Sequence, residues 1–398
     1  ELDRLCREGI QFSEALAVSP GSAASHAALL TSRYPVSSGV WANFSVMDGS
    51  VVTLAEILRE SGYRTGGFVT NTFLGKRFHF EQGFDSYVES GVVEAVEEPS
   101  AATLWRSLAV VQIIDRLRPR FDLGYDPSFE SALRWLEESD RPTFWFVHLM
   151  DVHSPYVPPP PYGERFGADP DGGPDTADRK RNKFGWRPSE EAYVAEIRFA
   201  DHKIGRLRRA LERRGWLDDA VILLTSDHGE NLLDHEPNFS HGVTLFDSTL
   251  RILAALRAPG RVAPALRADP WENVDALPQI AEVLGWDPHP DWEGRPLAAP
   301  ARTTPTYGQL NRDFAVRTPE WKVVLREDGT RDLYDLIRDP GETLPLTDAD
   351  RMDEADAAFR AWLSRTATPL YLEQARSVKP DELSPETVEK LKSLGYLE

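Results

Sequence analysis

The amino-acid sequence predicts an α/β fold, with a largely parallel central sheet, helices on both faces and a small antiparallel α+β subdomain at the C-terminal end. Strand-like and helix-like patterns alternate over most of the chain. The apolar segment Ala220–Leu224 runs into the polar stretch that contains Asp227 and His228, as expected where a buried parallel strand ends. After Gly260 the chain is rich in proline up to Pro305, and short strand-like segments then follow.

The elements follow in a regular order. The spacing of Leu2, Leu5 and Ile10 predicts a first helix, and a second begins at a small-residue turn in which Ser22 is placed as the N-cap. The other predicted elements are helix 51–61, strand 64–70, helix 128–138, strand 143–149, helix 189–214 with Ser189 as N-cap and Gly215 past its end, strand 218–225, strands 314–317 and 321–325, and a turn at 327–329.

This order predicts a catalytic α/β domain over residues 1–258, followed by a C-terminal part over 259–398 that completes the fold with a small antiparallel sheet and a terminal helix. Two irregular stretches, 91–127 and 155–188, interrupt the first part. Loops of this length are often lids or substrate-binding loops, and disordered insertions are the alternative.

Composition excludes several classes of protein. The chain has 398 residues and a net charge of −19, so it has no excess of Lys and Arg to bind nucleic acid. Its single cysteine, Cys6, excludes an intrachain disulfide and a cysteine-based zinc cluster. No apolar run reaches membrane-spanning length and no signal peptide is visible, which leaves the cellular location open.

Polar clusters stand near the ends of predicted strands or at the start of a helix. Asp227 and His228 offer a hard oxygen and an imidazole nitrogen, which suit a divalent cation; a solvated turn is the alternative. His153 follows the strand at 143–149, and His241 follows Asp227 by about one loop. Ser22 stands at a helix N-terminus, which can bind an anion. Because ligands bind beyond the carboxyl ends of parallel strands, these residues are expected to share one site.

Motifs along essentially the whole chain resemble those of the sulfatases, a family of the alkaline phosphatase superfamily, and the resemblance is to bacterial members. The segments that carry it are Leu2–Phe12, Ala27–Pro35, Gly62–Thr65, Gln82–Asp85, His153–Tyr156, Ser226–Glu230, His241-Gly242, Asp332–Leu336, Asp339–Glu342 and Lys392–Leu397.

The resemblance implies a metal-assisted hydrolase of sulfate, phosphate or phosphonate esters. Ser22 takes the nucleophile position, where active sulfatases carry a Cys or Ser oxidised to formylglycine. Asp227 and His228 take the place of metal ligands, with calcium the expected ion and magnesium, manganese or zinc the alternatives. His153 and His241 are expected to contact the substrate anion or to protonate the leaving group. The expected substrate is a small anionic ester or a sulfated or phosphorylated glycan.

The sequence also departs from the family pattern. Ala24 fits the formylglycine motif, but His26 stands where that motif has Arg, and Asn71 lies where a Lys-x-His pair is expected. His26 and Asn71 are therefore assigned to substrate binding. Two further Asp ligands of the family would precede position 1, so the chain is expected to be truncated at its N-terminus.

These departures leave alternatives to the hydrolase. One is a catalytically impaired, sulfatase-like protein that only binds anions. Another is a transferase of the same superfamily that moves a phosphoryl-containing group. If the chain is a hydrolase with unmodified Ser22, it is expected to prefer phosphoryl or phosphonyl esters at least as much as sulfate esters, because water can hydrolyse a phosphoserine.

Overall fold

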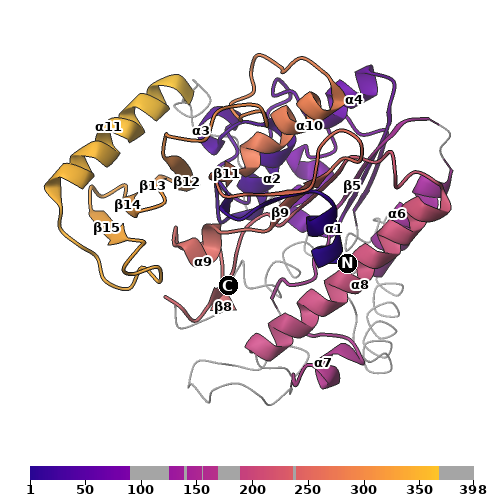
Figure 1. Ribbon diagram of the computed structural model, residues 1–398, viewed down its shortest axis with the longest axis horizontal. Helices are drawn as coiled ribbons and strands as arrows, with labels where there is room; N and C mark the ends of the chain where they lie inside the picture. The colour runs from indigo at the N-terminus through magenta and orange to yellow at the C-terminus, as the bar shows by residue number, and fades with distance from the viewer. Residues whose placement is uncertain (90–124, 139–140, 155, 169–188, 236–238, 367–398) are drawn as a thin grey trace, which may run out of the picture. The chain divides into compact units, whose positions relative to one another are not determined.

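A computed structural model describes residues 1–89, 125–138, 141–154, 156–168, 189–235 and 239–366 (Figure 1). These residues form two compact units, each described by itself. The first contains residues 1–62 and 76–83 and the described residues from 211 onward. The second contains residues 63–75 and the described residues of 84–210. The predicted boundary between 258 and 259 stays a prediction.

The first unit contains a four-stranded sheet with the order β10-β1-β9-β6. Strand β1 pairs parallel with β10 and antiparallel with β9, and β9 pairs antiparallel with β6. Helix α1 leads into this sheet through Gly9, where a Cβ atom would lie 2.4 Å from the backbone oxygen of Leu256. Only glycine allows this close approach. The bounds are α1 Leu2–Glu8, β1 Ile10–Phe12, β6 Ile222–Thr225, β9 Ala254–Arg257 and β10 Ala265–Arg267.

Strand β6 differs from its prediction. It was expected to be a buried parallel strand, but its pairing within the described residues is the antiparallel one with β9. Since β1 and β6 both run antiparallel to β9, they run in the same direction and their carboxyl ends meet at one edge. The chain therefore still delivers the segment after β1 and the segment after β6 to the same side of the sheet.

Helix α2, Ser22–Thr31, follows β1 and the short strand β2, Ala15–Leu16. The prediction of Ser22 as N-cap is wrong: Gly21 is the N-cap and, having no side chain, makes no capping hydrogen bond, and Ser22 is the first helical residue. The helix is alanine-rich and buried on nearly every side, since small side chains let neighbouring segments approach closely. The Ser22 hydroxyl, not used for capping, is left for another partner.

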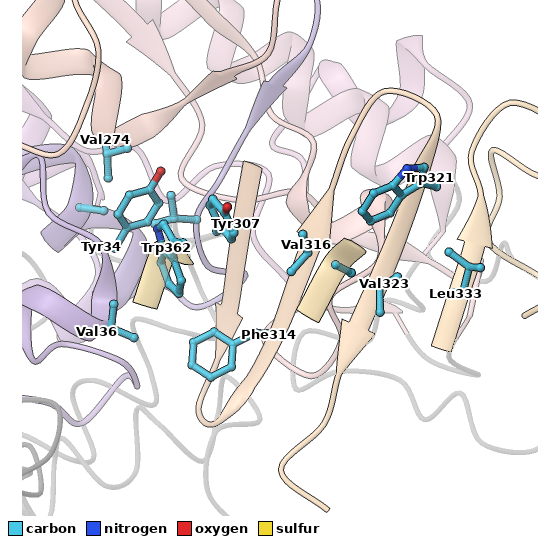
Figure 2. Packing of buried hydrophobic residues seen from close by; sticks show 13 residues of the cluster. Tyr34, Val36, Val274, Tyr307, Phe314, Val316, Trp321, Val323, Leu333 and Trp362 are labelled. Carbon is cyan, nitrogen blue, oxygen red and sulfur yellow. The ribbon is translucent and has the colours of Figure 1, made fainter. Parts of the chain in front are cut away.

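The C-terminal part of this unit confirms the expected antiparallel sheet, in the order β12-β13-β14-β15. Strands β13 and β14 match the predicted 314–317 and 321–325, whereas β12 and β15 were missed. Helix α11 packs on this sheet through Trp362, whose ring stacks on Tyr307 at 4.5 Å between centroids (Figures 1 and 2). The bounds are β12 Thr306–Leu310, β13 Asp313–Arg317, β14 Trp321–Leu325, β15 Arg331–Asp335 and α11 Ala349–Thr366.

A buried ion cluster ties this sheet to the segment after His241. Lys322 is fully buried, and its Nζ lies 2.5 Å from Asp247 Oδ1 and 2.7 Å from Glu342 Oε1. Arg317 also donates to Asp247. Burial alone would raise the pKa of Asp247, but Lys322 and Arg317 outweigh burial and lower it. Glu342, from the expected C-terminal motif, also accepts from the Asp247 N–H at 2.5 Å and so helps to fix the start of helix α9, Asp247–Leu250.

The remaining elements of the first unit are short except for α10. The expected helix at 51–61 is α4, which begins with a capping box of Thr53 and Glu56. The other bounds are α3 Pro35–Ser38, α4 Leu54–Glu60, η2 Lys76–Phe78, β7 Asn231–Leu232, β8 Phe239–Ser240, α9 Asp247–Leu250, β11 Trp271–Glu272, η3 Asn273–Asp275 and α10 Ala276–Leu284.

The second unit is built on a wholly parallel three-stranded sheet, β4-β3-β5, against which α6 packs through Trp135. The predicted strands and helices at 64–70, 128–138, 143–149 and 189–214 correspond to β3, α6, β5 and α8, and Ser189 caps α8 as expected. The bounds are β3 Arg64–Val69, η1 Thr72–Leu74, β4 Ser86–Glu89, α6 Tyr125–Glu137, β5 Thr143–Val147, α7 Tyr162–Arg165 and α8 Glu190–Arg213.

The α/β fold class and the C-terminal antiparallel sheet are thus confirmed. Most of the two stretches expected as lids, and the motif at 392–397, lie outside the described residues; one short helix, α7, lies within the second stretch. In the described part of the chain, no helix is long and apolar enough to cross a membrane.

Candidate active site

Ser22 and His228 meet at the carboxyl edge of the first unit's sheet. Ser22 Oγ lies 3.4 Å from His228 Nε2. Nδ1 of His228 lies 2.7 Å from the backbone oxygen of Gly229. Because a carbonyl oxygen can only accept, Nδ1 carries a proton, and in the neutral tautomer Nε2 presents a lone pair. The Ser22 hydroxyl therefore faces an imidazole nitrogen that can accept its proton.

The turn that carries His228 requires glycine at position 229. A Cβ atom there would lie 2.2 Å from the backbone oxygen of Ser248, and the Gly229 N–H donates to Thr249 O at 2.9 Å. This close contact holds the turn after β6 against helix α9, which contains Ser248 and Thr249. It fixes the backbone to which the His228 ring is anchored.

His26 and Asp227 form a second contact beside Ser22. His26 Nδ1 donates to the Ser22 carbonyl oxygen at 2.8 Å, one turn earlier in α2, and lies 3.6 Å from Asp227 Oδ2. Burial lowers the pKa of His26 even though Asp227 favours its charged form. His26 is therefore neutral at neutral pH and does not replace the fixed positive charge of an arginine. Asp227 Oδ2 also lies 3.4 Å from His228 Nε2.

His241 packs against His228, with 4.2 Å between ring centroids. Its Nδ1 lies 3.2 Å from both carboxyl oxygens of Glu230, to which it donates. Burial and the neighbouring His228 lower the pKa of His241. The structure thus brings Ser22, His26, Asp227, His228 and His241 together. Among these, the side chain of Asp227 is 22% exposed and those of His228 and His241 are 8% and 7% exposed.

The other two predicted site residues belong to the second unit. His153 Nδ1 donates to the backbone oxygen of Ser154 at 2.5 Å. Asn71 caps η1, accepting from the N–H of Phe73 at 2.9 Å. His148 lies just after β5 and shares a hydrogen bond with Thr70. The roles of His153 and Asn71 toward substrate stay predictions.

Comparison with known proteins decides the family. The family model described as Sulfatase matches residues 1–286 of this chain. The chain belongs to the sulfatase family. Among curated family relatives, choline-sulfatase of Rhizobium meliloti is 24% identical over 419 residues, which cover 90% of this chain and 80% of that protein.

Solved structures agree on the fold. BT4656, solved in complex with its substrate D-glucosamine-2-N,6-O-disulfate, superposes with a TM-score of 0.70 at 20% identity and covers 94% of this chain and 92% of that one. The phosphonate monoester hydrolase of Agrobacterium radiobacter gives a TM-score of 0.67 at 20% identity, with 94% and 90% covered. Sulfate-ester hydrolases and a phosphonate-ester hydrolase are therefore both among the similar proteins.

The expected metal site can be tested against these residues. His228 is suited to bind a metal, because its Nδ1–H donates to a carbonyl and the lone pair on Nε2 is left to coordinate an ion. Asp227 Oδ2 lies beside that nitrogen. However, no group of three or more His, Cys, Asp or Glu side chains within the described ranges is arranged to hold a metal ion. Calcium prefers six or more oxygens, so this pair alone does not make a calcium site.

Three residues near the site were missed from the sequence. Glu230 directly follows the Asp-His-Gly motif, so its position could have indicated its pairing with His241. Asn43 accepts from the N–H of Ala23 at 3.2 Å at the start of α2. Asn273 bonds to Ser25, 248 positions away along the chain. No local sequence pattern predicts the contacts of Asn43 and Asn273.

Proposed function

We propose that this chain is an ester hydrolase in which Ser22, unmodified, is the nucleophile, and that phosphoryl or phosphonyl esters are turned over at least as well as sulfate monoesters. The observation that carries the proposal is the 3.4 Å approach of Ser22 Oγ to His228 Nε2, while Nδ1 of the same ring faces the Gly229 carbonyl. A serine hydroxyl beside a fixed acceptor nitrogen is the arrangement that nucleophilic catalysis requires.

The reaction is then a double displacement. The Ser22 oxygen attacks phosphorus while its proton passes to His228 Nε2. The bond from phosphorus to the leaving oxygen breaks, and the leaving alkoxide takes a proton from solvent water. The hydroxide so formed attacks the phosphoserine and releases phosphate or phosphonate, and the Ser22 oxygen takes back the proton held by His228 Nε2. Apart from substrate and water, the groups that take part in these steps are the side chains of Ser22 and His228, which both belong to the first unit.

His26 supports the preference for phosphoryl groups. In the family the corresponding position is an arginine of the motif that directs oxidation to formylglycine, whereas His26 is buried, uncharged and bonded to the Ser22 carbonyl. An unmodified serine that attacked sulfur would leave a sulfated enzyme without the hemiacetal route by which formylglycine expels sulfate. A phosphoserine, by contrast, is hydrolysed by attack at phosphorus.

Asp227 and His228 are also proposed as the two ligands that this part of the chain offers to a divalent metal. Because the one lone pair on His228 Nε2 cannot bind an ion and accept a proton at the same time, His228 would act as the base only in the metal-free protein. When bound, such an ion would instead lower the pKa of the nearby Ser22 hydroxyl and neutralise charge on the transferring group. Substrates are proposed to be small anionic esters or sulfated or phosphorylated glycans. The finding that favours the alternative, a catalytically impaired protein, is that burial lowers the pKa of His26 and of His241, so neither supplies positive charge to stabilise the transferring group.

The test compares wild type, Ser22→Ala and the control Ser38→Ala on aryl sulfate, aryl phosphate and aryl phosphonate esters. Ser38 is buried in the same unit, at the end of α3, and its hydroxyl accepts from the Val40 N–H. We expect phosphoryl or phosphonyl turnover at least equal to sulfate turnover, lost in Ser22→Ala and kept in Ser38→Ala. Turnover that survives Ser22→Ala would exclude Ser22 as nucleophile, and no turnover of any ester would favour the anion-binding alternative.

A further inference from the structure

Asn273 contacts the Ser22 turn from a distant part of the chain. It lies in η3 and is fully buried. Its Oδ1 accepts from the N–H of Val18 at 3.1 Å. Its Nδ2 donates to the carbonyl oxygen of Ser25 at 3.1 Å and to the Ser25 hydroxyl at 2.8 Å. One amide side chain therefore bonds both sides of the turn that carries Ser22.

The contact continues to the turn after β6. The Ser25 hydroxyl, which accepts from Asn273, donates in turn to the backbone oxygen of Asp227 at 2.5 Å. The hydrogen bonds thus run from Asn273 through Ser25 to Asp227, one residue before His228. Ser22 lies between the two points that Asn273 holds, Val18 and Ser25. The separation of Ser22 Oγ and His228 Nε2 depends on how these two segments are joined.

We propose that Asn273 is a positioning residue that holds Ser22 in place against His228; this rests on the proposed role of Ser22 as nucleophile. Asparagine suits the position because one side chain must supply both an acceptor and two donors. Aspartate would lose the donors and place a carboxylate against the Ser25 carbonyl. Alanine would leave the Val18 N–H without its buried partner.

Kinetics separate positioning from general stability. We expect Asn273→Ala to lower kcat by roughly 10- to 100-fold and to change KM by less than about threefold, since a displacement near 1 Å costs about that much in rate. Ser25→Ala keeps the carbonyl and loses only the hydroxyl bridge, so it should lower kcat less, and the two effects should not add. It also serves as the milder variant if Asn273→Ala does not fold.

The matched control is Gln279→Ala. Gln279 is also a buried amide, and its Oε1 accepts from Trp271 Nε1 at 3.1 Å, a hydrogen bond in which no residue of the Ser22 turn takes part. This variant should lose thermal stability with kcat kept within about twofold, because a buried hydrogen bond is lost but the turn is not touched. A loss of kcat in Gln279→Ala equal to that in Asn273→Ala would overturn the positioning role.

Hydrogen exchange gives a readout that needs no turnover. In Asn273→Ala the backbone amides of residues 18–26 should exchange faster than in Gln279→Ala, when the two are compared at equal distance from their melting temperatures. Equal exchange in the two variants would contradict the proposal. If wild type hydrolyses none of the esters, the proposed function fails, and the exchange comparison still decides whether Asn273 holds this turn.

Discussion

Ser22 Oγ and His228 Nε2 lie 3.4 Å apart, although 206 positions separate the two residues in the chain. The approach depends on two features of the fold. Strands β1 and β6 run in the same direction, and the His228 ring is anchored through Nδ1 to the Gly229 carbonyl. The same lone pair on Nε2 can accept the Ser22 proton or bind a divalent cation.

Replacing His228 tests this lone pair. His228→Gln should lower kcat by about 10²- to 10⁴-fold, the usual contribution of a general base. The control is His289→Gln, since His289 contacts Trp292 and the N–H of Asp291, away from the Ser22 turn. Steady-state kinetics on the best aryl ester decides the outcome. Equal kcat in the two variants would show that His228 does not act on Ser22.

Calcium affinity tests the proposed ligand pair. The described residues bring together Asp227 and His228 but no group of three metal-binding side chains, so titration calorimetry on residues 1–398 should give a Kd no tighter than about 10⁻⁴ M. Asp227→Asn should remove the remaining binding, whereas Asp218→Asn, at an exposed acid outside the site, should not. Micromolar binding that survives Asp227→Asn would show that the ion is held elsewhere.

The glycine after His228 should be essential. In Gly229→Ala the added methyl group would collide with the Ser248 carbonyl at 2.2 Å, so the turn must move and take the His228 ring with it. We expect a lower melting temperature and a large loss of kcat. Gly49→Ala is the control, because a Cβ atom at Gly49 has nothing within 4 Å. Unchanged kcat in Gly229→Ala would mean that the turn adapts without moving the imidazole.

Local patterns predicted the elements of this fold better than its contacts. Helix α8 and its cap at Ser189 follow from spacing and residue type, as do strands β3, β5, β13 and β14. The antiparallel pairing of β6 was missed because an apolar segment does not reveal the direction of its neighbour. The N-cap was misplaced by one residue, from Gly21 to Ser22, because helix ends are defined by backbone geometry.

The site was predictable to the extent that its residues stand at element ends. Ser22, Asp227, His228 and His241 meet as expected. His26 does so too, but its ring nitrogen is bonded to the helix backbone, a detail that depends on burial and rotamer. The contacts of Asn273 join segments that are remote in the chain, and no periodicity or motif encodes such pairing.

Glu293 makes stability depend on pH. Its Oε2 accepts from the N–H of Tyr34 at 2.6 Å and from the Ser37 hydroxyl at 2.5 Å. Burial nevertheless raises the pKa of Glu293 from 4.5 to about 7. The folded protein therefore holds this proton more tightly than the unfolded chain does. The stabilisation is complete below pH 4.5 and is lost as the pH rises through about 7, by on the order of 3 kcal/mol in total.

Urea unfolding at a series of pH values measures this effect. Glu293→Gln keeps an acceptor oxygen for Tyr34 and Ser37 but does not titrate, so its free energy of unfolding should fall less than that of wild type between pH values of about 4.5 and 7. Glu327→Gln, at an exposed carboxylate, should retain the wild-type slope. Identical slopes in wild type and Glu293→Gln would show that Glu293 is ionised throughout this range.

The most direct measurement is mass spectrometry of the peptide that contains Ser22, taken from enzyme quenched during turnover of an aryl phosphate. We expect an unmodified serine in the resting enzyme and a phosphoserine at position 22 in the quenched sample, with no phosphorylated peptide from Ser22→Ala. An aldehyde at position 22 in the resting enzyme, together with efficient sulfate turnover, would contradict the proposed chemistry and indicate a formylglycine sulfatase.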